Sequence, residues 1–224
     1  VSVRQSAPTA WADCGYEVAF AQFVLHGCKS EVPVLEIAGL PELSVSEKGQ
    51  HLHIANDKIQ VVINKVTGLA ELTVNGVTAR NVNLPSVYRA MTDNDIRHMF
   101  FITGDREKQG GAGPETWATA GLKNIGFTCT RIYWEQPQAA LVRVCATLHG
   151  MGENGCGFDV NVIYSVLGDG RLICDNPIPP FGNLPVLPRL GARFTLSGDY
   201  QNVRWYGFGP WDTYADRDAC GRLG

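Results

Sequence analysis

Apolar and polar residues alternate along much of the chain, in short runs that turn-forming residues interrupt. Alternation with a period of two predicts half-buried strands, because successive side chains of a strand point to opposite faces. Turn signals recur about every ten residues, a pattern that favours an antiparallel sandwich. The predicted strands are residues 1–5, 16–25, 51–54, 58–64, 69–74, 125–134, 139–148, 157–167, 172–175, 189–196 and 203–208.

Two local signals refine this pattern. Asn75-Gly76 predicts a two-residue hairpin turn, because both central positions of that turn need a positive φ. The run from Pro114 to Gly121 predicts one short helix, with proline at its start and glycine at its end. Helical signals are otherwise scarce, so the expected fold class is all-β.

The composition is that of a globular protein with a core: 45% of the 224 residues are hydrophobic and 18% are charged. The formal net charge is −3 and no stripe of Lys and Arg is present. These features argue against a nucleic-acid partner and against binding to a membrane surface. No apolar run approaches the roughly 20 residues of a spanning helix.

Cysteine usage indicates the compartment. The seven cysteines are odd in number, and none belongs to the close CxxC pairs of zinc and redox sites. We therefore expect buried, reduced thiols. Reduced thiols indicate a reducing compartment such as the cytoplasm, with a bacterial periplasm as the alternative.

The usual catalytic signatures are missing: the sequence has no HExxH, GxSxG, Walker A or GxGxxG motif. His51 and His53 would share one face of a strand, but an exposed polar face explains them better than a metal site does. The glycine-rich stretch 110–113 lacks the Lys-Ser/Thr of a phosphate-binding loop and indicates an ordinary loop. We therefore assign no catalytic residue and no metal ligand.

The first informative motif is residues 88–95, Tyr-Arg-Ala-Met-Thr-Asp-Asn-Asp. Carboxylates and an amide beside an arginine can bind sugar hydroxyls, or they can hold a loop through charge-assisted hydrogen bonds. The alternative, which we favour, is structural: Asp93 and Asp95 cap a turn while Arg89 pairs internally.

Two further motifs lie near the end of the chain. Residues 187–191, Leu-Pro-Arg-Leu-Gly, indicate a strand entrance with Arg189 buried and paired. Residues 205–217 are rich in aromatics and form either a stacking platform for sugar rings or a structural corner. We favour the corner, because large aromatic rings usually bury large areas. The corner comprises Trp205, Gly207, Gly209, Pro210, Tyr214, Asp216 and Arg217.

Taken in order, these motifs resemble the C-terminal region of the large family-2 β-galactosidases. Residues 88–95 resemble the family's Arg-Ala-Pro-Thr-Asp-Asn-Asp stretch, with Met91 in place of proline. Residues 187–191 resemble its Leu-Pro-Arg-Ile-Gly, and 205–217 its Trp-x-Gly-x-Gly-Pro-x-Glu-x-Tyr-x-Asp-Arg, with Asp212 in place of glutamate. Residues 1–4 and 10–19 look like the end of the preceding immunoglobulin-like domain. The resemblance covers nearly the whole chain.

The resemblance implies three segments. Residues 1–26 would end an immunoglobulin-like sandwich, 27–42 would form a linker, and 43–224 would form a galactose-mutarotase-like antiparallel supersandwich. In the family, further strands follow the 205–217 motif, so we expect the supersandwich to be incomplete at its C-terminus. Exposed sheet edges would then be covered by dimerisation or by neighbouring segments.

The resemblance also implies where the chemistry lies. The family hydrolyses terminal β-galactosides with retention, using two glutamates of a central barrel that this chain does not contain. The Mg and Na ions of the full-length enzymes are bound elsewhere, and no cofactor is expected here. The stretch 97–113 would be a mobile loop at the active-site mouth. The candidates for contacts with the sugar or this loop are Asp93, Asn94, Asp95, Arg97, His98 and Trp117.

The expected function is therefore that of a non-catalytic part of a β-galactosidase, inactive alone. Its partners would be the rest of that chain, a galactoside substrate and further copies in a homo-oligomer. Two alternatives remain. One is a stand-alone carbohydrate-binding module that uses Trp205 and Trp211. The other is a mutarotase-like sugar epimerase, which needs a histidine–carboxylate pair that the dispersed histidines do not suggest.

Overall fold

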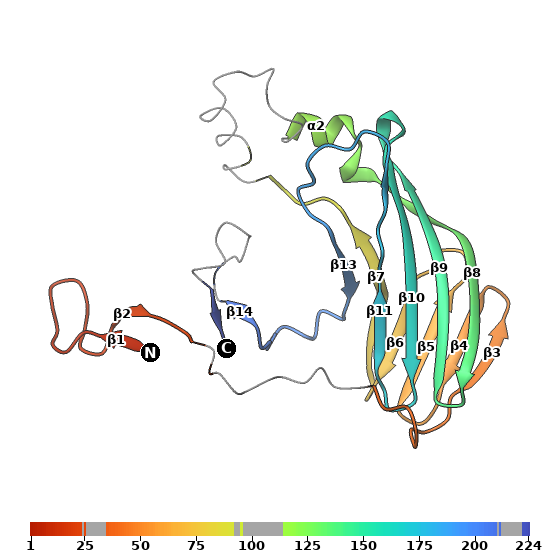
Figure 1. The fold of residues 1–224 in the computed structure, drawn as a ribbon, viewed down its shortest axis with the longest axis horizontal. Helices are drawn as coiled ribbons and strands as arrows, with labels where there is room; N and C mark the ends of the chain where they lie inside the picture. The colour runs from red at the N-terminus through yellow and green to blue at the C-terminus, as the bar shows by residue number, and fades with distance from the viewer. Residues whose placement is uncertain (24, 26–34, 92–94, 96–113, 210, 212–220) are drawn as a thin grey trace. The chain divides into compact units, whose positions relative to one another are not determined.

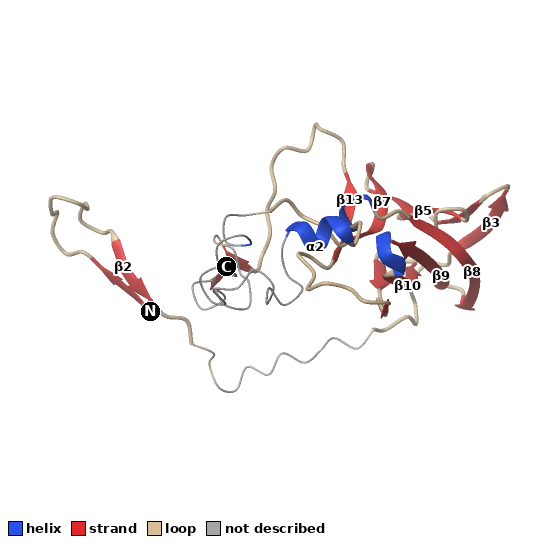
Figure 2. Cartoon of the chain, turned by 90° about the horizontal axis from the view of Figure 1, so that it is seen from above, coloured by secondary structure: helices blue, strands red, loops and turns tan. Residues whose placement is uncertain are grey.

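The structure is a computed structural model that describes residues 1–23, 25, 35–91, 95, 114–209, 211 and 221–224. The chain divides into two compact units. We call Glu36–Asp199 the sandwich unit, and Val1–Leu35 with Tyr200–Gly224 the terminal unit. Strands dominate the structure, as the red segments of Figure 2 show. The predicted all-β class and antiparallel pairing are confirmed.

The sandwich unit contains two antiparallel sheets that lie face to face in Figure 1. The first sheet has the strand order β13-β7-β6-β5-β4-β3. Its strands are β3 (Ser44–Lys48), β4 (His51–Ala55), β5 (Ile59–Asn64), β6 (Ala70–Val74), β7 (Val77–Ser86) and β13 (Gly191–Thr195). The second sheet has the order β11-β10-β9-β8, with β12 also paired to β10. Its strands are β8 (Phe127–Gln138), β9 (Leu141–Met151), β10 (Gly157–Leu167), β11 (Leu172–Asp175) and β12 (Pro180–Phe181).

The predicted hairpin turn is confirmed. Val74 of β6 pairs with Val77 of β7, so Asn75 and Gly76 form a two-residue turn. Their φ angles are +51° and +77°, the left-handed region that this turn requires. The amide side chain of Asn tolerates that region better than a branched side chain would.

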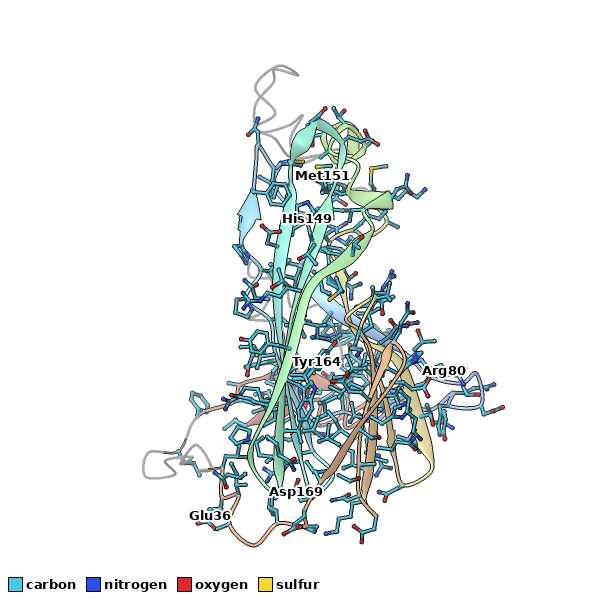
Figure 3. The ribbon with its side chains drawn as sticks, turned by 90° about the vertical axis from the view of Figure 1, so that its right-hand side faces the viewer. Glu36, Arg80, His149, Met151, Tyr164 and Asp169 are labelled. Atoms are coloured by element: carbon cyan, nitrogen blue, oxygen red, sulfur yellow. The ribbon has the colours of Figure 1, made fainter. Side chains whose placement is uncertain are left out.

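The core lies between the two sheets and follows the period-two pattern. Ile59, Val61 and Ile63 of β5 are buried, as are the alternate residues of β10 from Phe158 to Val166. Tyr164 of β10 is fully buried, and its hydroxyl lies 3.0 Å from the carbonyl oxygen of Gly68 in the facing sheet. Tyr164 lies midway along the sandwich, with His149 and Met151 near one end and Asp169 at the other (Figure 3).

The predicted helix is confirmed as α2 (Pro114–Thr119). It is followed by the 3-10 turn η2 (Leu122–Asn124), after Gly121 reverses the chain with a φ of +68°. A second 3-10 turn, η3 (Glu153–Gly155), connects β9 to β10. No helix among the described residues is long and apolar enough to cross a membrane.

The terminal unit contains two short hairpin-like pairs. Strand β1 (Ser2–Arg4) pairs with β2 (Glu17–Phe20), and β14 (Phe208–Gly209) pairs with β15 (Arg222–Leu223). Arg222 links them: its guanidinium lies 3.9 Å from the ring centroid of Phe20 and forms an ion pair with Glu17. No described residue of this unit is buried.

Several predictions are wrong in detail. Strand β3 and most of β7 were not predicted, because both are rich in polar residues and lie on half-exposed faces. The predicted strand 203–208 reduces to its last residue, Phe208, in β14. Arg189 is exposed and forms no ion pair with any described residue, because it precedes β13 at the edge of its sheet.

The cysteines fit the prediction only in part. Five lie among the described residues and all five are free thiols. Cys156 is buried and Cys129, Cys145 and Cys174 are half-buried. Cys14 is exposed, because no second sheet among the described residues covers the two-stranded β1–β2 piece. The division at residues 26 and 42 stays a prediction.

Candidate functional site

The sequence-predicted arginine motif forms a compact ion pair. Arg89 follows the buried end of β7 and binds Asp95 through two hydrogen bonds, Nη1 to Oδ2 at 2.6 Å and Nη2 to Oδ1 at 2.8 Å. The Arg89 and Asp95 side chains are only 23% and 14% exposed. A bidentate guanidinium–carboxylate pair is strong and directional, so it holds Asp95 against Arg89. The structural interpretation of Arg89, internal pairing, therefore describes the geometry.

Trp117 of α2 completes this cluster. The Arg89 guanidinium carbon lies 5.6 Å from the Trp117 ring centroid, within the range of a cation–π contact. The indole Nε1 donates a hydrogen bond to the carbonyl oxygen of Val186 at 2.8 Å. The indole is only 3% exposed, so it supports the surrounding segments.

The C-terminal end of α2 is held by the β9–β10 connection. The Glu153 amide donates to the carbonyl oxygen of Ala120 at 3.0 Å, and Asn154 Nδ2 donates to that of Thr119 at 3.0 Å. A Cβ at Gly121 would lie 2.8 Å from the Glu153 amide nitrogen, so a side chain there would push the two segments apart. Figure 1 shows α2 beside this turn, at one end of the sandwich.

The cluster brackets the predicted loop. Asp95 lies directly before the stretch 96–113, and α2 begins directly after it at Pro114. Arg89, Asp95 and Trp117 therefore join the two ends of this stretch. The other candidates, Asp93, Asn94, Arg97 and His98, and the loop prediction for 97–113 lie outside the described residues. The sugar-contact roles of all six candidates stay predictions.

The described aromatic residues of the motif near the chain end are exposed, and the corner formed by residues 205–217 stays a prediction. Trp205, Tyr206 and Phe208 are 61%, 80% and 58% exposed. The reason is geometric: β14 and β15 are two residues each, too short to cover an indole ring. The remaining corner residues Pro210, Tyr214, Asp216 and Arg217 lie outside the described residues.

Trp205 instead borders a shallow depression of about 310 Å³. A Cβ at Gly209 would lie 3.3 Å from the indole Cζ2, so glycine lets the chain pass beside the ring. The exposed indole lies beside Arg204 and Arg222, and its role as a stacking platform for sugar rings stays a prediction. The full lining is Val203, Arg204, Trp205, Gly207, Gly209, Arg222 and Gly224.

The structure also reveals a pair that the sequence analysis missed. His149 Nδ1 lies 2.7 Å from Asp159 Oδ1, and the imidazole stacks on Phe181 with a 5.2 Å centroid separation. The two residues are direct partners in the β9–β10 register. Only the register of this hairpin brings them together, so spacing along the chain gave no signal for them.

Two thiols and one phenol among the described residues have pKa values raised mainly by burial. Burial raises the pKa of the Cys174 thiol to about 11, and burial likewise raises the pKa of Cys129. Burial also raises the pKa of Tyr164. Raised values keep these groups protonated at neutral pH, whereas a nucleophilic thiol needs a lowered pKa.

No three His, Cys, Asp or Glu side chains lie close enough to hold a metal ion, within the part of the chain that the structure describes. His51 and His53 do lie side by side, with ring centroids 6.4 Å apart. Two imidazoles without a third donor make a poor zinc site.

Comparisons with known proteins converge on one family. The family described as "Beta galactosidase small chain" matches residues 55–224. A β-galactosidase of Priestia megaterium is 29% identical over the whole chain, which covers 20% of that protein. A β-galactosidase of Vibrio cholerae is 28% identical over 99% of the chain, which covers 21% of that protein. One from Clostridium acetobutylicum is 26% identical over the whole chain, covering 23% of its length. The chain thus spans about a fifth of the length of these relatives.

Proposed function

The chain belongs to the β-galactosidase small-chain family, and on that premise we propose that it is a non-catalytic C-terminal part of a β-galactosidase. The supporting observation is that the similarity covers the whole chain but only about a fifth of the relatives that bear this name. Hydrolysis with retention needs two carboxyl groups at a fixed separation of about 5 Å across the scissile bond. We assign those groups to residues outside this chain, together with any Mg²⁺ or Na⁺ that the complete enzyme binds.

Within that enzyme, the role of this chain is to hold one wall of the active site. The Arg89–Asp95–Trp117 cluster supports this proposal, because it ties both ends of the stretch 96–113 to the sandwich. Fixed ends lower the entropic cost of holding the segment between them in place. The five free cysteines among the described residues support a cytoplasmic location.

Complementation tests the non-catalytic role. The purified 224-residue chain should not hydrolyse lactose or a chromogenic galactoside. Addition of the complementary part of the enzyme, purified separately, should restore hydrolysis. Hydrolysis by the chain alone, after removal of contaminating enzyme by a second purification tag, would overturn the proposal.

Variants of the cluster test the loop-holding role in the complete enzyme. Asp95→Asn should lower kcat/KM for a galactoside while leaving the oligomeric state unchanged, because only the base of the loop is loosened. A matched control is Glu71→Gln, which removes an exposed ion pair with Arg80 between β6 and β7 of the first sheet. Equal kcat/KM values for both variants would contradict the role of the cluster.

The His149–Asp159 pair favours one alternative, a sugar epimerase. A histidine held by a carboxylate can transfer protons at an anomeric centre. The pair lies on the outward face of its sheet, with side chains 41% and 47% exposed. Polarimetry of α-galactose decides: faster anomerisation with this chain than with His149→Gln would support epimerisation, and equal rates would exclude it.

A further inference from the structure

Strand β8 forms one edge of the second sheet. It pairs with β9 on one side, and no strand among the described residues pairs with its other side. Figure 1 shows β8 on the side of β9 away from β10 and β11. At twelve residues β8 is also the longest strand of the structure. A long unpaired edge carries free N–H and C=O groups and is a template for another strand.

The ends of β8 are less available than its middle for pairing with another strand. The register with β9 shifts between Cys129 and Arg131 and again between Glu135 and Gln138. Both irregular ends are bound to other segments. At the first end, the Cys129 amide donates to the carbonyl oxygen of Val66 at 3.3 Å. Gln136 Nε2 donates to the carbonyl oxygen of Leu43 at 3.0 Å. The regular, uncovered run is therefore residues 131–135, with Tyr133 at its centre.

This run presents a single row of side chains on the outward face of the sheet. The opposite partners of Ile132 and Trp134 in β9 are the buried Ala146 and Val144, so both of these residues face inward. The row therefore consists of the alternate residues Arg131, Tyr133 and Glu135, which are all exposed. Along the strand, the three side chains are positively charged, aromatic and negatively charged.

We propose that this edge pairs with the same edge of a second copy of the chain, antiparallel, about a two-fold axis at Tyr133. The order of charges carries this inference. Antiparallel pairing centred on Tyr133 places Arg131 opposite Glu135 of the partner subunit, and does so twice. A parallel pairing in the same register would place Arg131 opposite an identical positive charge. Opposite charges on directly facing strand positions attract, and like charges destabilise.

The neighbouring strand extends the match. Glu135 binds Arg143 of β9 within the same chain, with 3.0 Å between Oε1 and Nη1. In the paired sheet, Glu135 would therefore lie between its own Arg143 and Arg131 of the partner subunit. The charges would alternate across three strands, because the residue opposite Arg131 in β9 is the uncharged Thr147. On the inward side, the Trp134 indole donates to Glu47 at 2.8 Å, which holds the run against the first sheet and leaves its backbone edge accessible.

Sedimentation velocity over a range of concentrations tests the proposal. The chain should form a dimer whose proportion rises with concentration, because a contact of one strand pair is small. Arg131→Glu makes the row uniformly negative and Glu135→Arg makes it uniformly positive. Each variant should weaken dimerisation by about tenfold or more. Arg80→Glu, on strand β7 of the other sheet, should leave dimerisation unchanged.

The decisive measurement mixes the two row variants. An equimolar mixture of Arg131→Glu and Glu135→Arg chains should recover a heterodimer, because every facing pair is then attractive. A folding defect cannot produce this recovery, and circular dichroism of each variant serves as a check. A chain that stays monomeric at high concentration, row variants that dimerise like the wild type, or a mixture that stays monomeric would each overturn the proposal.

Discussion

The two units of this chain are built from similar alternating sequences, yet they differ sharply in burial. Among the described residues, every buried hydrophobic side chain lies between Leu43 and Leu167, in the sandwich unit. In the terminal unit, Val3, Trp11 and Phe23 are 56%, 66% and 72% exposed. The difference shows that alternation selects which face of a strand is apolar, whereas burial needs a second layer. Two-stranded pieces do not supply that layer.

The comparison also separates their roles. The sandwich has the interlocked sheets of an independent folding unit, with Tyr164 hydrogen-bonded across the layers. The terminal unit presents exposed apolar side chains that, under the proposed function, contact other parts of the β-galactosidase. Mutations should therefore affect stability strongly in the sandwich and weakly in the terminal unit.

The largest contrast should come from core truncation. Ile54→Ala removes a fully buried side chain from β4 and should lower the free energy of unfolding by about 4 kcal/mol. Val3→Ala, at a half-exposed site of β1, should change it by about 0.5 kcal/mol or less. Urea unfolding followed by circular dichroism measures both. Similar losses for the two variants would remove the distinction between the units.

A glycine substitution should have the next largest effect. A Cβ at Gly168 would overlap the carbonyl oxygen of Pro41, and the backbone of Gly168 is held by a hydrogen bond to Ala140. We expect Gly168→Ala to cost about 3 kcal/mol. Gly207→Ala is the control in the terminal unit, because its Cβ would meet only Trp205 at an ordinary 3.6 Å. Thermal unfolding should show a lower Tm for Gly168→Ala alone.

Two substitutions that break ion pairs should differ less in their effect on stability. Asp95→Asn removes the charge from the carboxylate that binds the half-buried Arg89 guanidinium and should cost about 2 kcal/mol in the sandwich unit. Glu17→Gln breaks the pair with Arg222 in the terminal unit, whose side chains are more exposed at 24% and 41%, and should lower the unfolding midpoint less. A larger loss for Glu17→Gln than for Asp95→Asn would contradict this order.

The smallest effect should appear only in acid. Hydrogen bonds from Lys65 and Trp134 hold the pKa of Glu47 below its usual value near 4.5. A lowered folded-state pKa contributes stability above pH 4.5 that is lost as pH falls through the folded value. Glu47→Gln should therefore show a shallower loss of Tm below pH 4.5 than the wild type. Parallel pH profiles for the two proteins would show that Glu47 does not contribute.

The sequence predicted most strands of the sandwich because those strands alternate strictly. Strands β10 and β11 match their predicted bounds, and the Asn75-Gly76 turn has the expected geometry. The predictions failed where local pattern carries little information. Polar β3 becomes a strand through its partner β4, and residues 203–207 are not a strand because, among the described residues, no partner strand pairs with them.

The contacts of the candidate site likewise divide into those that the sequence predicted and those that only the structure revealed. The charge and spacing of the 88–95 motif predicted internal pairing for Arg89, and Asp95 is its partner. Nothing along the chain indicated that Trp117 lies under that arginine, or that His149 faces Asp159. These contacts depend on where α2 docks and on the register of β9 and β10.

Local physical chemistry, written in the sequence, determined the all-β class, the turns, the short helix and the membership of a β-galactosidase family. Tertiary structure alone decided which apolar faces are buried, which edges stay open and which charged residues meet. The reason is that φ preferences and alternation act over a few neighbouring residues. Burial, strand edges and ion pairs depend instead on segments that are distant in the chain and adjacent in space.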